Sequence, residues 1–286
     1  MGEYMAIAGR FRGDQLALLL DEMAATADGQ SCAEWGVAYC HGTLLEILRG
    51  VSRALSSERE ASGVLGQPDA GPDPSSRKVD DSRATQRGLQ PAGPEARAVS
   101  RTDFGGLREI KTDVAIAYLS FAGEPVSRQP LLRREAVRSQ AFCAPGRLKD
   151  PHALSIGQRF TRTDDPVERF FLHVVDSCEE GDPISSVTAM HERLAGEPDQ
   201  RFMLLNTKRL VVSTWCAGAV PAQATPLGGA GEHQPEEPVL WLGRAAQVRV
   251  LAPRRLAAAG DMKWEPLPAS TVLAFARRRY EAGQPD

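Results

Sequence analysis

The stretch that decides the fold runs from residue 164 to residue 176 and reads DDPVERFFLHVVD. Its pattern predicts the start of an amphipathic helix. Asp165 can cap the N-terminus, Pro166 takes the first helical position, where a missing N–H costs nothing, and Glu168 completes a capping-box arrangement. Apolar residues then recur at helical spacing and mark one buried face: Val167, Phe170, Phe171, Val174 and Val175.

On both sides of this helix the apolar pattern predicts strands and two further helices. One helix is expected from about Asp14, and another after Asp182, with a buried face made of Ile184, Val187, Met190 and Leu194. Strands are expected near residues 5–8, 34–40, 44–48, 113–119, 139–143, 201–205, 210–215, 239–242, 247–251 and 271–275. Strands, then two helices, then strands again predict an α+β fold with helices layered on antiparallel sheets.

Composition predicts one globular domain over residues 1–286 in the cytoplasm. The formal net charge of −3 and the pI near 6.0 give no reason to expect nucleic acid as a partner. No apolar run approaches the roughly 20 residues that a membrane helix needs, so no membrane partner is expected. Five cysteines without a Cys-x-x-Cys pair fit reduced thiols. Residues 56–103 are expected to be a disordered insertion and residues 217–237 a flexible loop, because both are rich in small and polar residues.

The order of these elements resembles that of the class II glutamine amidotransferases, which are Ntn-hydrolases. The resemblance covers nearly the whole chain outside the two insertions. It implies a four-layer αββα sandwich, in which two stacked antiparallel sheets are flanked by helices. The motifs that carry it are the strand Met5-Ala6-Ile7-Ala8-Gly9, the segment Ala33-Glu34-Trp35-Gly36, the helix start at 164–172, the hairpin at 202–214 and a closing strand at 263–273.

The resemblance implies that the reacting groups of this family are missing. In the family an N-terminal Cys attacks the glutamine amide, and its free α-amine relays the proton. Met5 or Ala6 stands at that place, and neither side chain is a nucleophile. The family's His-Asn-Gly oxyanion turn corresponds to Ala144, Pro145 and Gly146. Pro145 provides neither a side-chain amide nor a backbone N–H.

The groups that hold glutamine in the family are also replaced. Ser120 stands where the family has an Arg for the α-carboxylate. Gln129 and Pro130 correspond to a His-Pro pair, and the family's amine-binding Asp falls on Pro166, next to Asp165. The candidates for a reshaped ligand pocket are therefore Trp35, Ser120, Gln129, Cys143, Gly146 and Asp165.

No other group in the sequence predicts a metal or a cofactor. The five histidines lack metal-ligand spacing. Cys143 is the thiol nearest the expected pocket, but no His adjoins it in sequence to activate it. The basic run Arg277-Arg278-Arg279 fits a solvated terminal helix.

These replacements predict a pseudoenzyme that acts as a partner, scaffold or regulatory subunit, with a protein of the same pathway as its partner. Two alternatives stay open. One is an active glutamine amidotransferase or amidohydrolase with relocated catalytic residues. The other is a small-molecule sensor that binds a glutamine-like or γ-glutamyl compound in the reshaped pocket.

Overall fold

The computed structural model describes residues 2–25, 32–51, 104–122, 128–135, 138–145, 148–178, 181–216 and 240–277. The expected insertion at residues 56–103 and the expected loop at residues 217–237 lie outside these ranges. Within the described ranges, no helix combines the length and the apolar character needed to span a bilayer.

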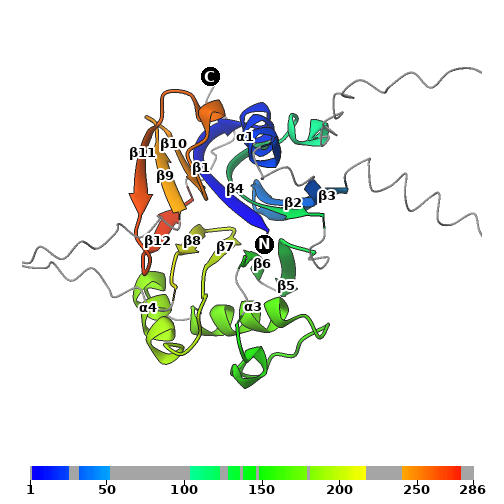
Figure 1. The fold of residues 1–286 in the computed structure, drawn as a ribbon. Helices are drawn as coiled ribbons and strands as arrows, with labels where there is room; N and C mark the ends of the chain where they lie inside the picture. The colour runs from blue at the N-terminus through cyan, green and yellow to red at the C-terminus, as the bar shows by residue number, and fades with distance from the viewer. Residues whose placement is uncertain are drawn as a thin grey trace, which may run out of the picture.

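Two antiparallel sheets lie face to face at the centre of the molecule (Figure 1). The seven strands of the larger sheet are β1 (Glu3–Arg12), β2 (Cys32–His41), β3 (Leu44–Val51), β4 (Lys111–Phe121), β9 (Leu240–Arg244), β10 (Val248–Ala252) and β11 (Lys263–Leu267). Their order is β11-β9-β10-β1-β4-β2-β3. The five strands of the smaller sheet are β5 (Leu131–Glu135), β6 (Arg138–Cys143), β7 (Phe202–Asn206), β8 (Arg209–Ser213) and β12 (Val272–Ala276), in the order β12-β8-β7-β6-β5.

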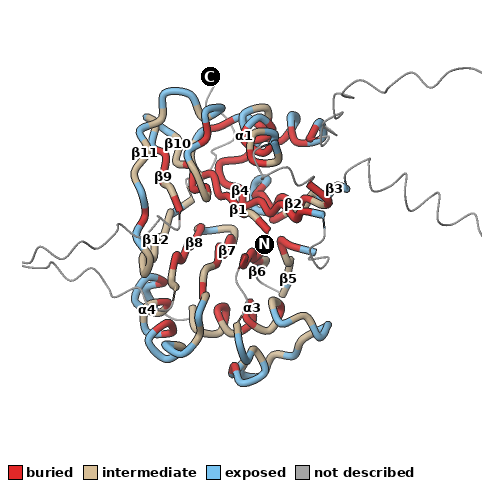
Figure 2. The backbone as a smooth tube through the Cα atoms, in the orientation of Figure 1, coloured by how far each residue is buried: buried red, intermediate tan, exposed pale blue. Residues whose placement is uncertain are grey.

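Helices cover the outer face of each sheet (Figure 1). Helix α1 (Gly13–Ala25) packs on the larger sheet, and α3 (Pro166–Ser177) and α4 (Pro183–Arg193) pack on the smaller one. Short 3-10 helices occupy Gly105–Leu107, Pro151–Ala153 and Ala257–Ala259. Buried backbone runs through the sheets and along the inner faces of the helices (Figure 2). The α+β fold and the four-layer sandwich expected from the sequence are confirmed.

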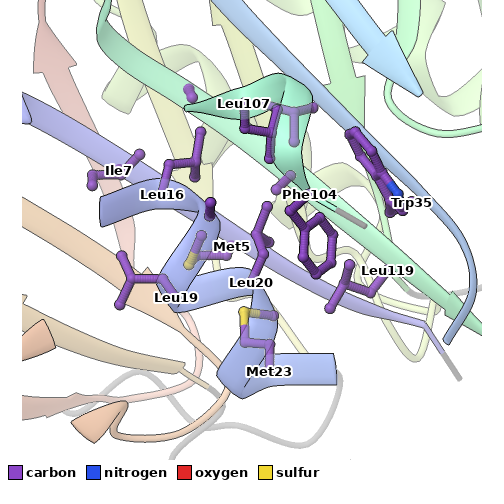
Figure 3. Packing of buried hydrophobic residues seen from close by; sticks show 14 of the residues in the cluster. Met5, Ile7, Leu16, Leu19, Leu20, Met23, Trp35, Phe104, Leu107 and Leu119 are labelled. Atoms are coloured by element: carbon purple, nitrogen blue, oxygen red, sulfur yellow. The ribbon is translucent and has the colours of Figure 1, made fainter. Parts of the chain in front are cut away.

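Three apolar clusters fill the spaces between the layers. The first lies between α1 and the larger sheet, where Met5 packs with Leu16 and Leu20 (Figure 3). The second lies between the two sheets, and the third lies between the smaller sheet and α3 with α4. Strand β4 alternates between the first two clusters: Ala117 and Leu119 face α1, whereas Ile116 and Tyr118 face the other sheet. Its nearly continuous apolar run follows from burial on both faces.

The start of α3 confirms one half of the predicted cap and corrects the other. Asp165 caps the helix, because its Oδ1 accepts a hydrogen bond of 2.8 Å from the Val167 N–H. The Glu168 side chain does not bond the N-cap residue, although the Glu168 N–H donates to the Asp165 carbonyl at 3.0 Å. Its carboxylate instead accepts from the N–H groups of Arg162 and Thr163 and from the Thr163 hydroxyl. The carboxylate therefore holds the preceding loop against the helix.

The C-terminal part of the sandwich differs from the sequence prediction in two elements. Residues 263–273 do not form one closing strand. Strand β11 pairs with β9 in the larger sheet and β12 pairs with β8 in the smaller, so the chain crosses between sheets near Ser270, whose φ is 70°. The prediction of the buried face of α4 is also partly wrong. Ile184, which was expected to be buried, is 42% exposed, and His191 is fully buried beside Met190. The spacing of the apolar residues alone cannot locate the buried face of α4, because the polar side chain of His191 belongs to that face.

Candidate functional site

The start of β1 offers no attacking group. Met5 and Ala6 are fully buried inside the strand, on opposite faces, and β1 already begins at Glu3. Gly2 directly precedes this strand. Gly2 is buried there, and a Cβ at Gly2 would collide with the ring and hydroxyl of Tyr118. Any side chain at residue 2 would therefore require Tyr118 to move.

The backbone just beyond β6 is already occupied by hydrogen bonds. Ala144, the first residue after the strand, donates its N–H to Gln129 Oε1 at 2.6 Å. Gln129 Nε2 donates in return to the Ala144 carbonyl at 3.0 Å, and the Gln129 residue is buried. Residues 129–130 also lie directly against β2, where a Cβ at Gly36 would collide with the Gln129 backbone oxygen. Pro145 follows with no N–H, so neither Ala144 nor Pro145 has a free backbone donor to polarise an amide.

Replacing Gln129 with leucine should lower the free energy of unfolding by about 2 kcal/mol, because it leaves the buried N–H and carbonyl of Ala144 without partners. Urea unfolding of the variant and the native protein measures the difference. Gln158 is exposed, so Gln158→Leu serves as the control and should change stability little. Equal stabilities of the two variants would contradict a structural role for the Gln129 amide.

Three of the five thiols are poorly suited to attack. Cys143 lies between the sheets, and burial raises the pKa of its thiol well above the ordinary value despite the nearby charge of Arg49. Burial likewise raises the pKa of Cys40 and of Cys178 to about 11. A thiol is nucleophilic as the thiolate, so these three groups are protonated and unreactive near neutral pH.

The other predicted pocket residues that the structure describes lie on different elements of the fold. Trp35 faces the α1 layer and lies against Phe104, with ring centroids 5.3 Å apart (Figure 3). Ser120 is buried in β4, and Asp165 caps α3. Gly146 lies outside the described residues. The assignment of these side chains to a ligand site stays a prediction.

The described residues do form a pocket at a different place, where the edge strand of each sheet meets the start of α3. Its volume is about 210 Å³, and it is lined by Arg49, Leu131, Leu132, Arg133, Arg162, Thr163, Glu168 and Phe171. None of the five described residues proposed from the sequence is among its lining residues. No spacing in the sequence could have revealed it, because β3 and β5 come together only through the stacking of the two sheets.

A Ser-His arrangement elsewhere in the fold is structural. Ser213 Oγ lies 2.7 Å from His191 Nε2, and His191 Nδ1 lies 2.6 Å from Gln200 Oε1. All three side chains are fully buried, so no substrate can reach the hydroxyl. Within the described ranges, no three His, Cys, Asp or Glu side chains are grouped so that they could hold a metal ion.

Comparison with known proteins gives matches to solved structures only. No family model and no curated protein matches the sequence. Glutamine phosphoribosylpyrophosphate amidotransferase from B. subtilis, complexed with ADP and GMP, matches over 99% of this chain and 50% of its own, with a TM-score of 0.58 and 13% identity. A structure described as the allosteric regulatory enzyme of purine biosynthesis matches over the same shares, with a TM-score of 0.57 and 14% identity.

A third structure is of similar size to this chain. It is described as a predicted glutamine amidotransferase from Pseudomonas aeruginosa and matches over 96% of this chain and 94% of its own, with a TM-score of 0.50 and 12% identity. This chain spans about half the length of the first two structures. At such identities the similarity concerns the fold alone: the chain has the Ntn-hydrolase-like sandwich fold of the class II glutamine amidotransferase domains.

Proposed function

We propose that this protein is a non-catalytic member of the amidotransferase-like fold that acts as a partner or regulatory subunit. The observation that carries the proposal is the bonded pair of Gln129 and Ala144. It ties up the first backbone N–H beyond β6, next to Pro145, in the segment where the resemblance expects an oxyanion hole. The buried Gly2 against Tyr118 supports the same reading at the start of β1.

Incubation with L-glutamine is expected to release no ammonia above a buffer blank. The electrophilic glutamine analogue 6-diazo-5-oxo-L-norleucine is expected to leave the mass of the protein unchanged, because the candidate thiol Cys143 is buried and protonated. An ammonia assay and intact-protein mass spectrometry provide the two measurements. Labelling that disappears in Cys143→Ala would establish a relocated nucleophile and overturn the proposal, as would any glutamine-dependent ammonia release.

The partner that we propose is a protein of the same pathway in the cytoplasm. The five cysteines are free thiols, which fits a reducing compartment. Co-expression with the products of neighbouring genes, followed by size-exclusion chromatography, tests the proposal. A stoichiometric complex would support it, and elution of the protein alone beside every candidate would argue against a partner encoded nearby.

A small-molecule sensor is the second candidate function, and the pocket between β3, β5 and α3 favours it. A sensor needs a ligand that binds the native state and thereby stabilises it. The residues that line this pocket restrict the chemistry of that ligand.

A further inference from the structure

The residues that line the pocket come from the larger sheet, the smaller sheet and the helix layer, which meet at one edge of the sandwich. Arg49 comes from β3, the edge strand of the larger sheet, and Arg133 comes from β5, the edge strand of the smaller sheet. Arg162 belongs to the loop that leads into α3, and Phe171 belongs to α3 itself. A ligand here would touch both sheets and the helix layer.

The charges around the pocket do not balance. Arg133 is paired, since its Nε lies 3.0 Å from Glu135 Oε1. The Glu168 carboxylate accepts hydrogen bonds from the N–H groups of Arg162 and Thr163 and from the Thr163 hydroxyl. Although burial acts to raise it, these hydrogen bonds lower the pKa of Glu168, so the carboxylate is ionised and already used.

Arg49 and Arg162 are the two lining cations that pair with no carboxylate of the described residues. Arg49 Nη2 donates to the backbone oxygens of Arg128 and Pro130, at 2.8 and 2.7 Å, and has no carboxylate partner in the described part of the chain. Burial lowers the pKa of Arg49, and the like charge of Arg128 lowers it further. The Arg162 side chain is exposed and forms no ion pair with any described residue. A bound anion would supply the missing counter-charge.

The rest of the lining is apolar. Leu131, Leu132 and Phe171 form that part of the wall, so an anion with a hydrocarbon body gains more than a bare inorganic ion. The volume of about 210 Å³ lies below the roughly 300–1,000 Å³ of pockets that hold drug-sized ligands. Such a space suits a short organic acid rather than a nucleotide.

We propose that this pocket binds a small organic carboxylate, with the carboxylate against Arg49 and Arg162 and the hydrocarbon chain on Leu131, Leu132 and Phe171. Arginine is suited to this role because its planar guanidinium forms two parallel hydrogen bonds to a carboxylate. The ligand needs no amino group. Glu168 is the carboxylate in the lining, and its bonds to residues 162 and 163 leave it little capacity for an ammonium. The proposal stands whether or not the protein has a catalytic activity.

Calorimetric titration of the full chain with hexanoate tests the proposal, with hexanamide, L-glutamine and inorganic phosphate as comparison probes. Hexanoate should bind saturably. Hexanamide, which has the same chain without the charge, should bind more weakly by about tenfold or more. L-glutamine and phosphate should also bind more weakly, because one carries an ammonium and the other lacks the apolar body.

Arg49→Met and Arg162→Met should each weaken hexanoate binding by about tenfold. Arg49 also anchors residues 128–130. Arg162→Met removes no side-chain hydrogen bond or ion pair to the described residues, so it keeps the test valid if Arg49→Met folds poorly. Arg134→Met is the matched control, since Arg134 is exposed on β5 and does not line the pocket. Unchanged affinity in Arg162→Met overturns the proposal, as does hexanamide binding as well as hexanoate. Tighter binding of glutamine would identify a relic substrate site instead, and tighter binding of phosphate an inorganic anion site.

Discussion

Replacing Arg277 with leucine is expected to lower the free energy of unfolding by about 3–5 kcal/mol, the usual cost of removing one partner of a buried ion pair. Arg277 Nε lies 2.7 Å from Asp113 Oδ1, and each side chain is only 7% exposed. The second oxygen, Asp113 Oδ2, is buried without a hydrogen-bond partner among the described residues. Loss of the guanidinium would therefore leave the buried Asp113 carboxylate without this ion pair and with neither oxygen bonded to a side chain. Urea unfolding monitored by circular dichroism measures the change.

The double variant Asp113→Leu/Arg277→Leu separates the ion pair from simple packing. Two apolar side chains can replace a buried pair at little net cost, so the double variant should recover most of the lost stability. Asp113 belongs to β4 of the larger sheet and Arg277 directly follows β12 of the smaller one, so the pair ties the two sheets together. If the double variant were as unstable as Arg277→Leu, the loss would come from packing or from the Thr207 contact of Arg277 instead.

The Arg277 pair also marks a limit of sequence reasoning. A basic run near the end of a chain usually faces solvent, and the sequence alone predicts a solvated helix there. That prediction is wrong for Arg277, because its partner lies 164 positions earlier in the chain. A charge pattern reports on local neighbours, whereas this pair forms only after the sheets stack.

Patterns among residues close together in the sequence, by contrast, predicted several helices and strands correctly. The capped helix at Asp165, the hairpin at residues 202–214 and the helix at Asp14 all depend on residues close together in the sequence, and the structure contains each of them. Strand β5 has the run Leu-Leu-Arg-Arg-Glu without alternation, so its state comes from pairing with β6 and not from its own pattern. The pocket lined by Arg49, Arg133 and Arg162 also forms only when the two sheets and α3 pack together, so the sequence did not predict it.

His191 shows the same limit for a single side chain. Its position on α4 suggests a solvated helix surface, yet it is fully buried and stacks on Trp215 with ring centroids 4.8 Å apart. Gln200 Nε2 donates to the Leu194 carbonyl, so its Oε1 faces His191 and must accept from Nδ1–H. Nε2 is then left to accept from the Ser213 hydroxyl. The hydrogen-bond chain therefore fits only the neutral imidazole.

Acidification from pH 6.5 to pH 4 is accordingly expected to remove about 3 kcal/mol of stability through His191 alone. Burial lowers the pKa of His191 from 6.5 to about 4, although the bond to Gln200 acts in the opposite direction. Between these values the unfolded chain binds a proton that the folded protein does not. The contribution is therefore fully present above pH 6.5 and disappears as the pH falls toward 4.

Urea unfolding at pH 7.5, 6.0, 5.0 and 4.5 measures this dependence in the native protein and in His191→Leu. The variant should be less stable at pH 7.5, because Ser213 and Gln200 lose a buried partner, but its stability should fall less steeply with acid. His152→Gln is the control: His152 is exposed, and the variant should keep the native slope. Carboxylates also titrate at the acid end, so the decisive quantity is the difference in slope between the native protein and His191→Leu between pH 7.5 and 5.0. Identical slopes would mean that His191 takes up its proton without unfolding, and that the Ser213 hydroxyl can reverse to accept from a charged imidazole.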